Sequence, residues 1–501
     1  MKLYPGILFW GAAGLWLAAF GSWSPLHRSS AAALNRKKIL LTGICVLLIA
    51  AFSCWLMGLS PKWNGTIPDH RDEYERITES FLQGKLYLDI EVDPRLEAME
   101  NPYDPFLRAD AGAESFWDAA YYNGHYYMYF GVVPVFLAFL PFRLLTGQTL
   151  ISTDAVRFFT VLYLISESFY FFWLIRTRFK KMTMGQALSL LIVFSFFSLL
   201  YVIKLPSLYQ VPVVCGMFLE TWSLYFFSRA ALEKRSENSA MRMACAGSLF
   251  GALVFGCKPT IALANLAVIP LVFRFLKERK ISPRLIGKMA LAALPYLAVG
   301  AGLMWYNQAR FGSPLEFGQG YQMTIRDQRT LKILDPLNLV KVPVELVNSL
   351  FALPKLEMFF PFAGQGWGAF ALCPIALYAL FTPGNTGDLS RSRQDLRGFF
   401  LAVWGAVLLM IIVQATKTPG VWDRYKNDYM WLLSLAAFLV IGAWTELRED
   451  VRSFSWKIAL ACGLCMIPLA LNFLVPYDEN FTEYYPEALE QIWNAVRLHG
   501  I

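Results

Sequence analysis

The sequence predicts an all-α polytopic membrane protein, and composition, segment length and charge placement each indicate this class. The chain has 501 residues, of which 56% are hydrophobic and 16% are charged, whereas a soluble domain carries about 25% charged residues. The hydrophobic residues form blocks of about 18 to 23, the length at which a helix crosses a hydrocarbon core of about 30 Å. The net charge of +8 follows from basic connections between these blocks, so it indicates membrane topology and no nucleic-acid partner.

Twelve segments are expected to cross the membrane, which makes a bundle of about 12 transmembrane helices. They cover residues 3–22, 39–59, 155–175, 186–204, 208–228, 243–257, 259–276, 286–306, 366–382, 398–415, 427–445 and 456–475. The first segment has the composition of a signal peptide, but "GSWSPLHRSS" after it is an unconvincing cleavage site, so an uncleaved helix is expected.

Basic residues predict which side of the membrane each connection faces. Six alternate connections hold 24 of the 45 Lys and Arg, and the positive-inside rule places them in the cytoplasm. They are "HRSSAAALNRKK", "RTRFKK", "RAALEKRSENSAMR", "RFLKERKISPRLIGK", "RSRQDLR" and "ELREDVRSFSWK". Residues 60–154, 307–365, 416–426 and the tail from 476 then lie outside, together with both termini.

One apolar segment does not fit the count of twelve. Residues 131–146, "GVVPVFLAFLPFRLLT", contain two prolines and one arginine and number only 16. A further full span here would put "RTRFKK" on the outer side. We therefore expect a re-entrant or interfacial helix on the outer face, and a thirteenth span is the alternative.

These assignments divide the chain into six parts. They are an extra N-terminal helix with its basic loop (1–38), a first core helix with an acidic outer loop and juxtamembrane helices (39–154), a transmembrane bundle (155–306), a second outer loop (307–365), C-terminal transmembrane helices (366–475) and an external tail (476–501).

The first outer loop is acidic and begins with an amphipathic helix. Residues 60–130 contain 14 Asp or Glu and six Lys or Arg. Helical spacing of apolar residues predicts a helix over 69–82 that lies on the membrane surface, with Asp69 as N-cap and Asp72 and Glu73 in the first turn. A carboxylate placed there suits general-base chemistry, although acids also favour this position through the helix dipole.

Aromatic residues gather in "FWDAAYYNGHYYMYFG", which includes Asp118, His125 and Tyr126. Such a cluster is typical of a membrane-interface belt. Aromatic rings beside a carboxylate also bind sugar rings, so both interpretations stand. The four His and eight Cys form no zinc-site pattern, and "CGLC" (Cys462 to Cys465) inside an apolar segment indicates packing.

The order of several short motifs resembles the GT-C superfamily of membrane glycosyltransferases, in particular bacterial relatives of protein O-mannosyltransferases and aminoarabinose transferases. The motifs are the acidic pair and tyrosine "DEY" (72–74) on the outer helix, "YNGHYYMYFGVVPVFLAFLP" (122–141), "WYNQARFGSPLEFGQGYQMT" and "VWDRYKNDYMWLL". The resemblance covers most of residues 39–445. It implies transfer of a sugar from a polyprenyl-phosphate donor on the outer face of the bacterial cytoplasmic membrane.

The resemblance also implies residue roles. Asp72 would be the general base that deprotonates an acceptor hydroxyl, and Glu73 would assist it. The donor phosphate needs cations at the membrane edge, since an unpaired phosphate in low dielectric is costly. The cations proposed for it are Arg424, Lys426, Arg310 and Lys258, although each is also explained by snorkelling at the interface. Tyr425, Glu316 and Tyr321 would line the substrate cavity, with Asp118, His125 and Tyr126 as further substrate-binding residues.

No cofactor is expected beyond the lipid-linked donor. The metal-dependent branch of the superfamily uses a D-x-D motif, whereas "DHRD" has two intervening residues, so no divalent metal is expected. The acceptor would be an envelope glycan, lipid or protein, and membrane lipids surround the chain. The alternatives are a polysaccharide polymerase or ligase, whose main outer loop usually comes late in the chain, and a transporter of lipid-linked sugars.

Overall fold

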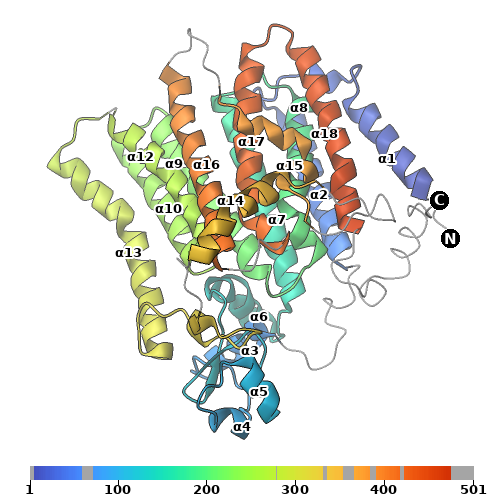
Figure 1. Cartoon of the computed structure of the whole chain (residues 1–501). Helices are drawn as coiled ribbons and strands as arrows, with labels where there is room; N and C mark the ends of the chain where they lie inside the picture. Colours follow the sequence, from blue (N-terminus) through green and yellow to red (C-terminus); the bar gives the residue numbers. More distant parts are fainter. Residues whose placement is uncertain are drawn as a thin grey trace.

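The computed structural model describes residues 5–58, 72–277, 279–330, 336–353, 366–383, 391–417 and 423–474. A broad bundle of long helices carries a small polar lobe at one end (Figure 1). Within these ranges the only sheet is a two-stranded hairpin. The predicted class, an all-α polytopic membrane protein, agrees with this architecture.

Nine helices in the described part of the chain are long and apolar enough to cross a membrane. They are α2 (Arg36–Gly58), α7 (Ser152–Thr177), α8 (Met184–Lys204), α9 (Val211–Leu232), the continuous run of α11 (Pro259–Ala262), η4 (Leu263–Ala267) and α12 (Val268–Lys277), α13 (Pro283–Phe311), α16 (Arg391–Lys417), η8 (Asp423–Lys426) joined to α17 (Asn427–Leu447), and α18 (Val451–Leu474). The most apolar windows of α8, α9 and α17 are 89%, 83% and 83% buried, so these three helices are the most enclosed of the nine.

Three of the twelve predicted spans do not meet this description. Residues 5–20 form α1 (Pro5–Phe20), whose described part has 16 residues, and 237–255 form α10 (Glu237–Phe255), whose sequence is rich in Gly, Ser and Ala. The predicted span 366–382 is two short helices, α15 (Ala369–Leu372) and η7 (Pro374–Leu380). Pro374 has no backbone N–H and ends α15. Nine spans therefore meet the length and composition criteria within the described residues, and the predicted count of about twelve is not confirmed.

The lobe consists of short helices that begin at capping aspartates. Asp72, Asp93 and Asp104 accept backbone N–H bonds at the starts of α3 (Glu73–Leu82), α4 (Pro94–Glu97) and α5 (Pro105–Ala111). These bonds satisfy amides that have no partner within the helix. The hairpin of β1 (Ala120–Tyr122) and β2 (His125–Tyr127) turns at Asn123–Gly124, where both residues have positive φ, as a tight two-residue turn requires.

The proline-containing segment 131–146 forms a short helix beside the lobe. Its π-helical turn η3 (Val135–Phe139) continues into α6 (Leu140–Thr146). Twelve helical residues rise about 18 Å, less than the hydrocarbon thickness of about 30 Å. Phe136, Leu144 and Leu145 are 53%, 65% and 85% exposed. This length and exposure favour an interfacial helix over a thirteenth span.

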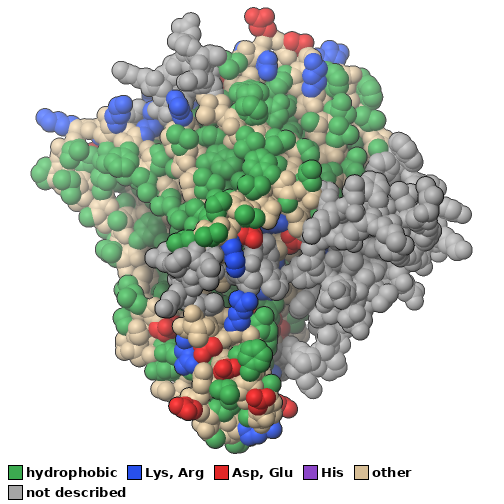
Figure 2. Space-filling model, in the orientation of Figure 1, with side chains coloured by type: hydrophobic (Ala, Val, Ile, Leu, Met, Phe, Trp, Pro, Cys, Tyr) green, Lys and Arg blue, Asp and Glu red, His purple; other side chains and the backbone are tan. Residues whose placement is uncertain are grey.

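Three of the basic connections meet at the end of the bundle opposite the lobe. Ala31 N–H donates to Met182 O over 2.8 Å, and Lys181 N–H donates to the Glu446 carboxylate over 2.6 Å. Figure 2 shows Lys and Arg side chains along the upper rim, a hydrophobic band below them and a lobe of mixed charge at the lower end. The lobe and these connections thus lie on opposite faces, as the charge alternation predicts.

Labelling of introduced cysteines will test which face is external. We expect an impermeant maleimide to reach a cysteine at Gln148, near the end of α6, in intact cells, and to reach one at Lys180 only after the membrane is opened. The reason is the positive-inside rule, since Lys180 lies in the basic connection between α7 and α8. Labelling of Lys180→Cys but not Gln148→Cys in intact cells would reverse the topology.

Candidate functional site

The lobe packs directly against one end of the transmembrane bundle, with backbone contacts between the two parts. Tyr74 in α3 donates its hydroxyl to Gly131 O over 3.2 Å, and Val133 N–H donates to Gly256 O over 2.8 Å. A Cβ atom on Gly131 would lie 2.1 Å from Cys257 O, so the chain can pass here only without a side chain. We call the region where the lobe meets the ends of α9, α10, α11 and α17 the junction.

Asp72 lies at the junction as the N-cap of α3. The helix begins at Glu73, so Asp72 precedes the first turn rather than lying in it, and Asp69 lies outside the described residues. The correction has a physical reason, because the Asp72 Oδ1 atom accepts the N–H groups of Tyr74 and Glu75 over 3.0 and 3.3 Å. Burial raises the pKa of Asp72, and the two amide hydrogen bonds oppose that rise.

Glu73 is buried directly behind Asp72. Its side chain is 2% exposed, and Oε2 accepts the N–H of Tyr129 over 3.0 Å. Burial raises the pKa of Glu73 well above its ordinary value, and the neighbouring carboxylates Asp118 and Asp72 raise it further. Three carboxylates thus share one region of low dielectric, the arrangement in which a carboxyl can hold a proton near neutral pH.

Asp118 connects the lobe to the bundle. It accepts hydrogen bonds from the hydroxyl of Tyr209, which precedes α9, and from the amide of Gln322 over 3.1 Å. Burial raises the pKa of Asp118, while Tyr209 and Arg424 oppose that rise. Asp118 therefore stands beside a cation that comes from the start of α17, more than 300 positions away in the sequence.

Arg424 and Lys258 are two cations that the described residues bring to the junction. The Arg424 guanidinium carbon lies 4.5 Å from the ring centre of Tyr209 and 5.2 Å from that of Tyr425. Lys258 Nζ lies 5.1 Å from the Tyr425 ring and 2.8 Å from Asp428 Oδ1. Tyr425 thus lies between the cations, and cation–π contacts of this kind stabilise a positive charge near an apolar surface.

Two of the predicted phosphate ligands, Lys426 and Arg310, are buried and donate hydrogen bonds to other groups of the chain. Lys426 is buried and donates to Asp423 over 2.7 Å and to Trp367 O over 2.6 Å. Arg310 is also buried, donates to Met128 O over 2.8 Å and lies over the Tyr306 ring. These contacts hold both side chains inside the protein, and their role as phosphate ligands stays a prediction.

Four other predicted residues belong to the aromatic cluster around the hairpin. His125 stacks on Tyr87 at 4.1 Å, and Tyr126 is buried. Tyr321 lies 4.7 Å from the ring of Tyr122, and Glu316 accepts the N–H of Gly318 over 2.6 Å. These contacts organise the lobe. The cluster connects to Asp118 through Gln322, which follows Tyr321 in the chain.

Sequence reasoning missed Tyr209 and Asp428 as parts of the junction. Asp428 is fully buried and accepts hydrogen bonds from Thr260 over 2.8 Å and from Gln414 over 2.9 Å, besides its ion pair with Lys258. Asp428 stands in the quoted "VWDRYKNDYMWLL" motif, where it could have been found. Tyr209 lies in an uncharged connection that carries no motif, so only the tertiary fold identifies it.

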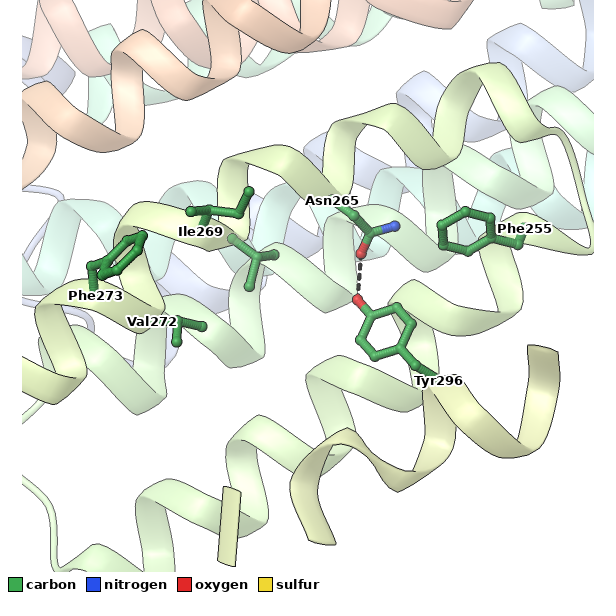
Figure 3. A pocket seen from close by; sticks show the side chains of 7 residues that line it. Phe255, Asn265, Ile269, Val272, Phe273 and Tyr296 are labelled. Atoms are coloured by element: carbon green, nitrogen blue, oxygen red, sulfur yellow. Dashed lines mark hydrogen bonds between the residues drawn. The ribbon is translucent and has the colours of Figure 1, made fainter. Parts of the chain in front are cut away.

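A separate cavity of about 410 Å³ opens between α10, α12 and α13 (Figure 3). Its wall is apolar except for Asn265 and Tyr296, whose side chains hydrogen-bond to each other over 2.5 Å. None of its lining residues is one of the candidate site residues, and its two polar side chains satisfy each other. The cavity adds no chemical group to the junction.

Comparison of the chain with protein-family models, with curated proteins and with solved structures finds no match. No group of three or more His, Cys, Asp or Glu in the described ranges is arranged to hold a metal ion. The resemblance to membrane glycosyltransferases and the metal-independent reaction therefore stay predictions.

The buried carboxyl of Glu73 predicts how stability depends on pH. The folded chain keeps its proton above pH 4.5, the ordinary pKa of this group, whereas the unfolded chain loses it. The folded state then binds more protons, so this group lowers the free energy of unfolding as pH rises towards its folded pKa. Glutamine does not titrate, so Glu73→Gln should not lose this part of its stability as pH rises. We therefore expect the thermal midpoint of the variant, measured in nanodiscs, to increase relative to that of wild type between about pH 5 and about pH 8. A constant difference between the two thermal midpoints across this range would contradict the raised pKa of Glu73.

Proposed function

We propose that the protein is a membrane glycosyltransferase that moves a sugar from a polyprenyl-phosphate donor to an acceptor hydroxyl at the junction. One observation carries the proposal. Carboxylates from residues 72, 73 and 118 and cations from residues 258 and 424 converge where a polar lobe meets the transmembrane helix ends. A lipid-borne donor reaches such a place from the membrane, and a polar acceptor reaches it from water.

Asp72 is the proposed base. Its carboxylate takes the acceptor proton as the acceptor oxygen bonds to the anomeric carbon, and the bond from that carbon to the phosphate oxygen breaks. Attack from the side opposite the phosphate inverts the configuration. Burial raises the pKa of Asp72, which makes its carboxylate a stronger base than that of an exposed aspartate.

Arg424 is the proposed phosphate ligand. Arg424 lies half-buried over the rings of Tyr209 and Tyr425 at the lobe side of the bundle, where its charge acts on Asp118. A guanidinium offers two parallel N–H groups to a phosphate, so it stabilises the leaving group as negative charge develops.

The test is a transfer assay with the protein in nanodiscs. A panel of polyprenyl-phosphate sugars is offered together with delipidated envelope fractions as acceptors, and release of polyprenyl phosphate is measured. We expect one donor to be consumed and its sugar to appear in the acceptor fraction with inverted configuration. Consumption of no donor in the panel, with wild type that is folded and monodisperse, would contradict the proposal.

A transporter of lipid-linked sugars is the second candidate, and one residue favours it. Glu220 in α9 is fully buried, and neither carboxylate oxygen has a hydrogen-bond partner among the described residues. Buried carboxylates inside membranes often mark ion or proton paths. Movement of a fluorescent lipid-linked sugar across proteoliposomes, without release of polyprenyl phosphate, would favour this candidate over transfer.

A further inference from the structure

Trp117 is a large aromatic residue that the proposed reaction leaves without a role. It is 54% exposed on the lobe, immediately before Asp118. Its side chain interacts with both the Asp118 carboxylate and the Tyr209 hydroxyl. An indole ring is therefore presented at the surface of the junction, next to a carboxylate.

The backbone holds Trp117 in this outward position. Asp118 has φ 63°, in the left-handed region that few residues other than glycine occupy. Asp118 N–H donates to Met323 O over 3.0 Å, and Met323 N–H donates to Ala119 O over 2.9 Å. The turn separates the exposed Trp117 from the fully buried Ala119. Unusual backbone conformations that the surrounding structure enforces are concentrated at functional sites.

The polar groups beside the ring have capacity for a ligand. Asp118 accepts hydrogen bonds from Tyr209 and Gln322 and also interacts with the Trp117 side chain. A carboxylate has about four acceptor positions, so capacity for one further donor is left. A pyranose ring presents an apolar face of C–H groups and an edge of hydroxyls. The apolar face suits the indole, and the hydroxyl edge suits the remaining acceptor capacity of Asp118 and the side-chain carbonyl of Gln322.

We infer that Trp117, Asp118 and Gln322 form a subsite for one pyranose ring, with Trp117 as a positioning residue that stacks on the sugar. This inference rests on the proposed function and adds to it the place where a sugar is held. An exposed tryptophan near a bilayer is also typical of a membrane-interface belt. The two roles differ in one property, because only the subsite changes the affinity for a water-soluble sugar.

The experiment is saturation-transfer NMR on the full chain in nanodiscs, with a mixture of methyl pyranosides as the probe. The proteins compared are wild type, Trp117→Ala, Trp117→Phe and Phe106→Ala. The last is the control, because Phe106 is another aromatic residue of the lobe and is 78% exposed. We expect at least one pyranoside to receive saturation from wild type. Its dissociation constant should rise about tenfold in Trp117→Ala, as expected for loss of an aromatic contact, and change less than about threefold in Trp117→Phe and Phe106→Ala.

The outcomes separate this inference from the proposed function. No saturation of any pyranoside by wild type, or equal affinity in wild type and Trp117→Ala, would overturn the subsite. Transfer in the donor assay that is unaffected in Trp117→Ala would leave the glycosyltransferase in place and remove Trp117 from it. Pyranoside binding that depends on Trp117 without any donor consumption would keep the subsite and reject the transferase.

Discussion

Replacement of Asp72 by Asn is expected to lower the rate of sugar transfer by roughly a hundredfold to ten-thousandfold, the usual range for loss of a general base. Asparagine has nearly the same size and is as good an N-cap as aspartate, so its side-chain oxygen can still accept the N–H groups of Tyr74 and Glu75. It cannot take up a proton from the acceptor. The measurement is turnover in the donor assay, with donor binding and the thermal midpoint followed on the same preparation.

A matched control separates chemistry from helix capping. Asp104 is the N-cap of α5 in the same lobe and accepts the amides of Phe106 and Leu107, so Asp104→Asn should keep wild-type turnover. Asp72→Ala should be as inactive as Asp72→Asn and also lose about 1 kcal/mol of stability with the cap. Near-normal turnover in Asp72→Asn would remove Asp72 as the base. Inactive Glu73→Gln beside active Asp72→Asn would assign the base to Glu73.

Replacement of Arg424 by Ala is expected to weaken donor binding about tenfold to a hundredfold, which corresponds to about 1.5–3 kcal/mol for a charge-assisted contact. The reason is the position of its guanidinium over Tyr209 and Tyr425, beside Asp118. Arg424→Lys should recover part of the affinity, because lysine keeps the charge and loses the planar fork. Donor binding is measured by titration of a nonhydrolysable polyprenyl-phosphonate sugar into nanodiscs.

Arg329 provides the control for a general effect of charge. It lies on the lobe with its guanidinium 4.2 Å from the ring of Tyr103 and pairs with Asp327. Arg329→Ala therefore removes the same charge and the same kind of cation–π contact away from the junction. Equal donor affinity in Arg424→Ala and wild type would exclude Arg424 from the site, and equal losses in both variants would indicate long-range electrostatics instead of contact.

The spanning helices are largely predictable because length and hydropathy determine them locally. The two faces of the bundle follow from the basic connections for the same reason. The start of α3 was misplaced because an acidic sequence offers several capping residues, and Asp72 rather than Asp69 accepts the first amides in the described structure. The interruption at Pro374 was also missed, since overall hydropathy does not register a single lost N–H.

The junction was predictable only in part. Motif order identified Asp72, Glu73, Asp118 and Arg424, yet nothing local shows that Asp118 and Arg424 lie together. The sequence placed Lys426 and Arg310 beside Arg424 as phosphate ligands, because a basic residue at a helix end has the same sequence pattern whether it faces a ligand or, as these two do, a carbonyl of the chain. That distinction depends on partners far away in the chain.

The bare backbone of Gly131 against the carbonyl groups of Cys257 and Gly256 has a mechanical consequence. Any side chain at position 131 would collide with these carbonyl groups, so a substitution of Gly131 would push the lobe away from the end of α10. The hydrogen bond from Val133 N–H to Gly256 O would then lengthen or break. The spacing between the carboxylates of the lobe and the cations of the bundle thus depends on the absence of one methyl group.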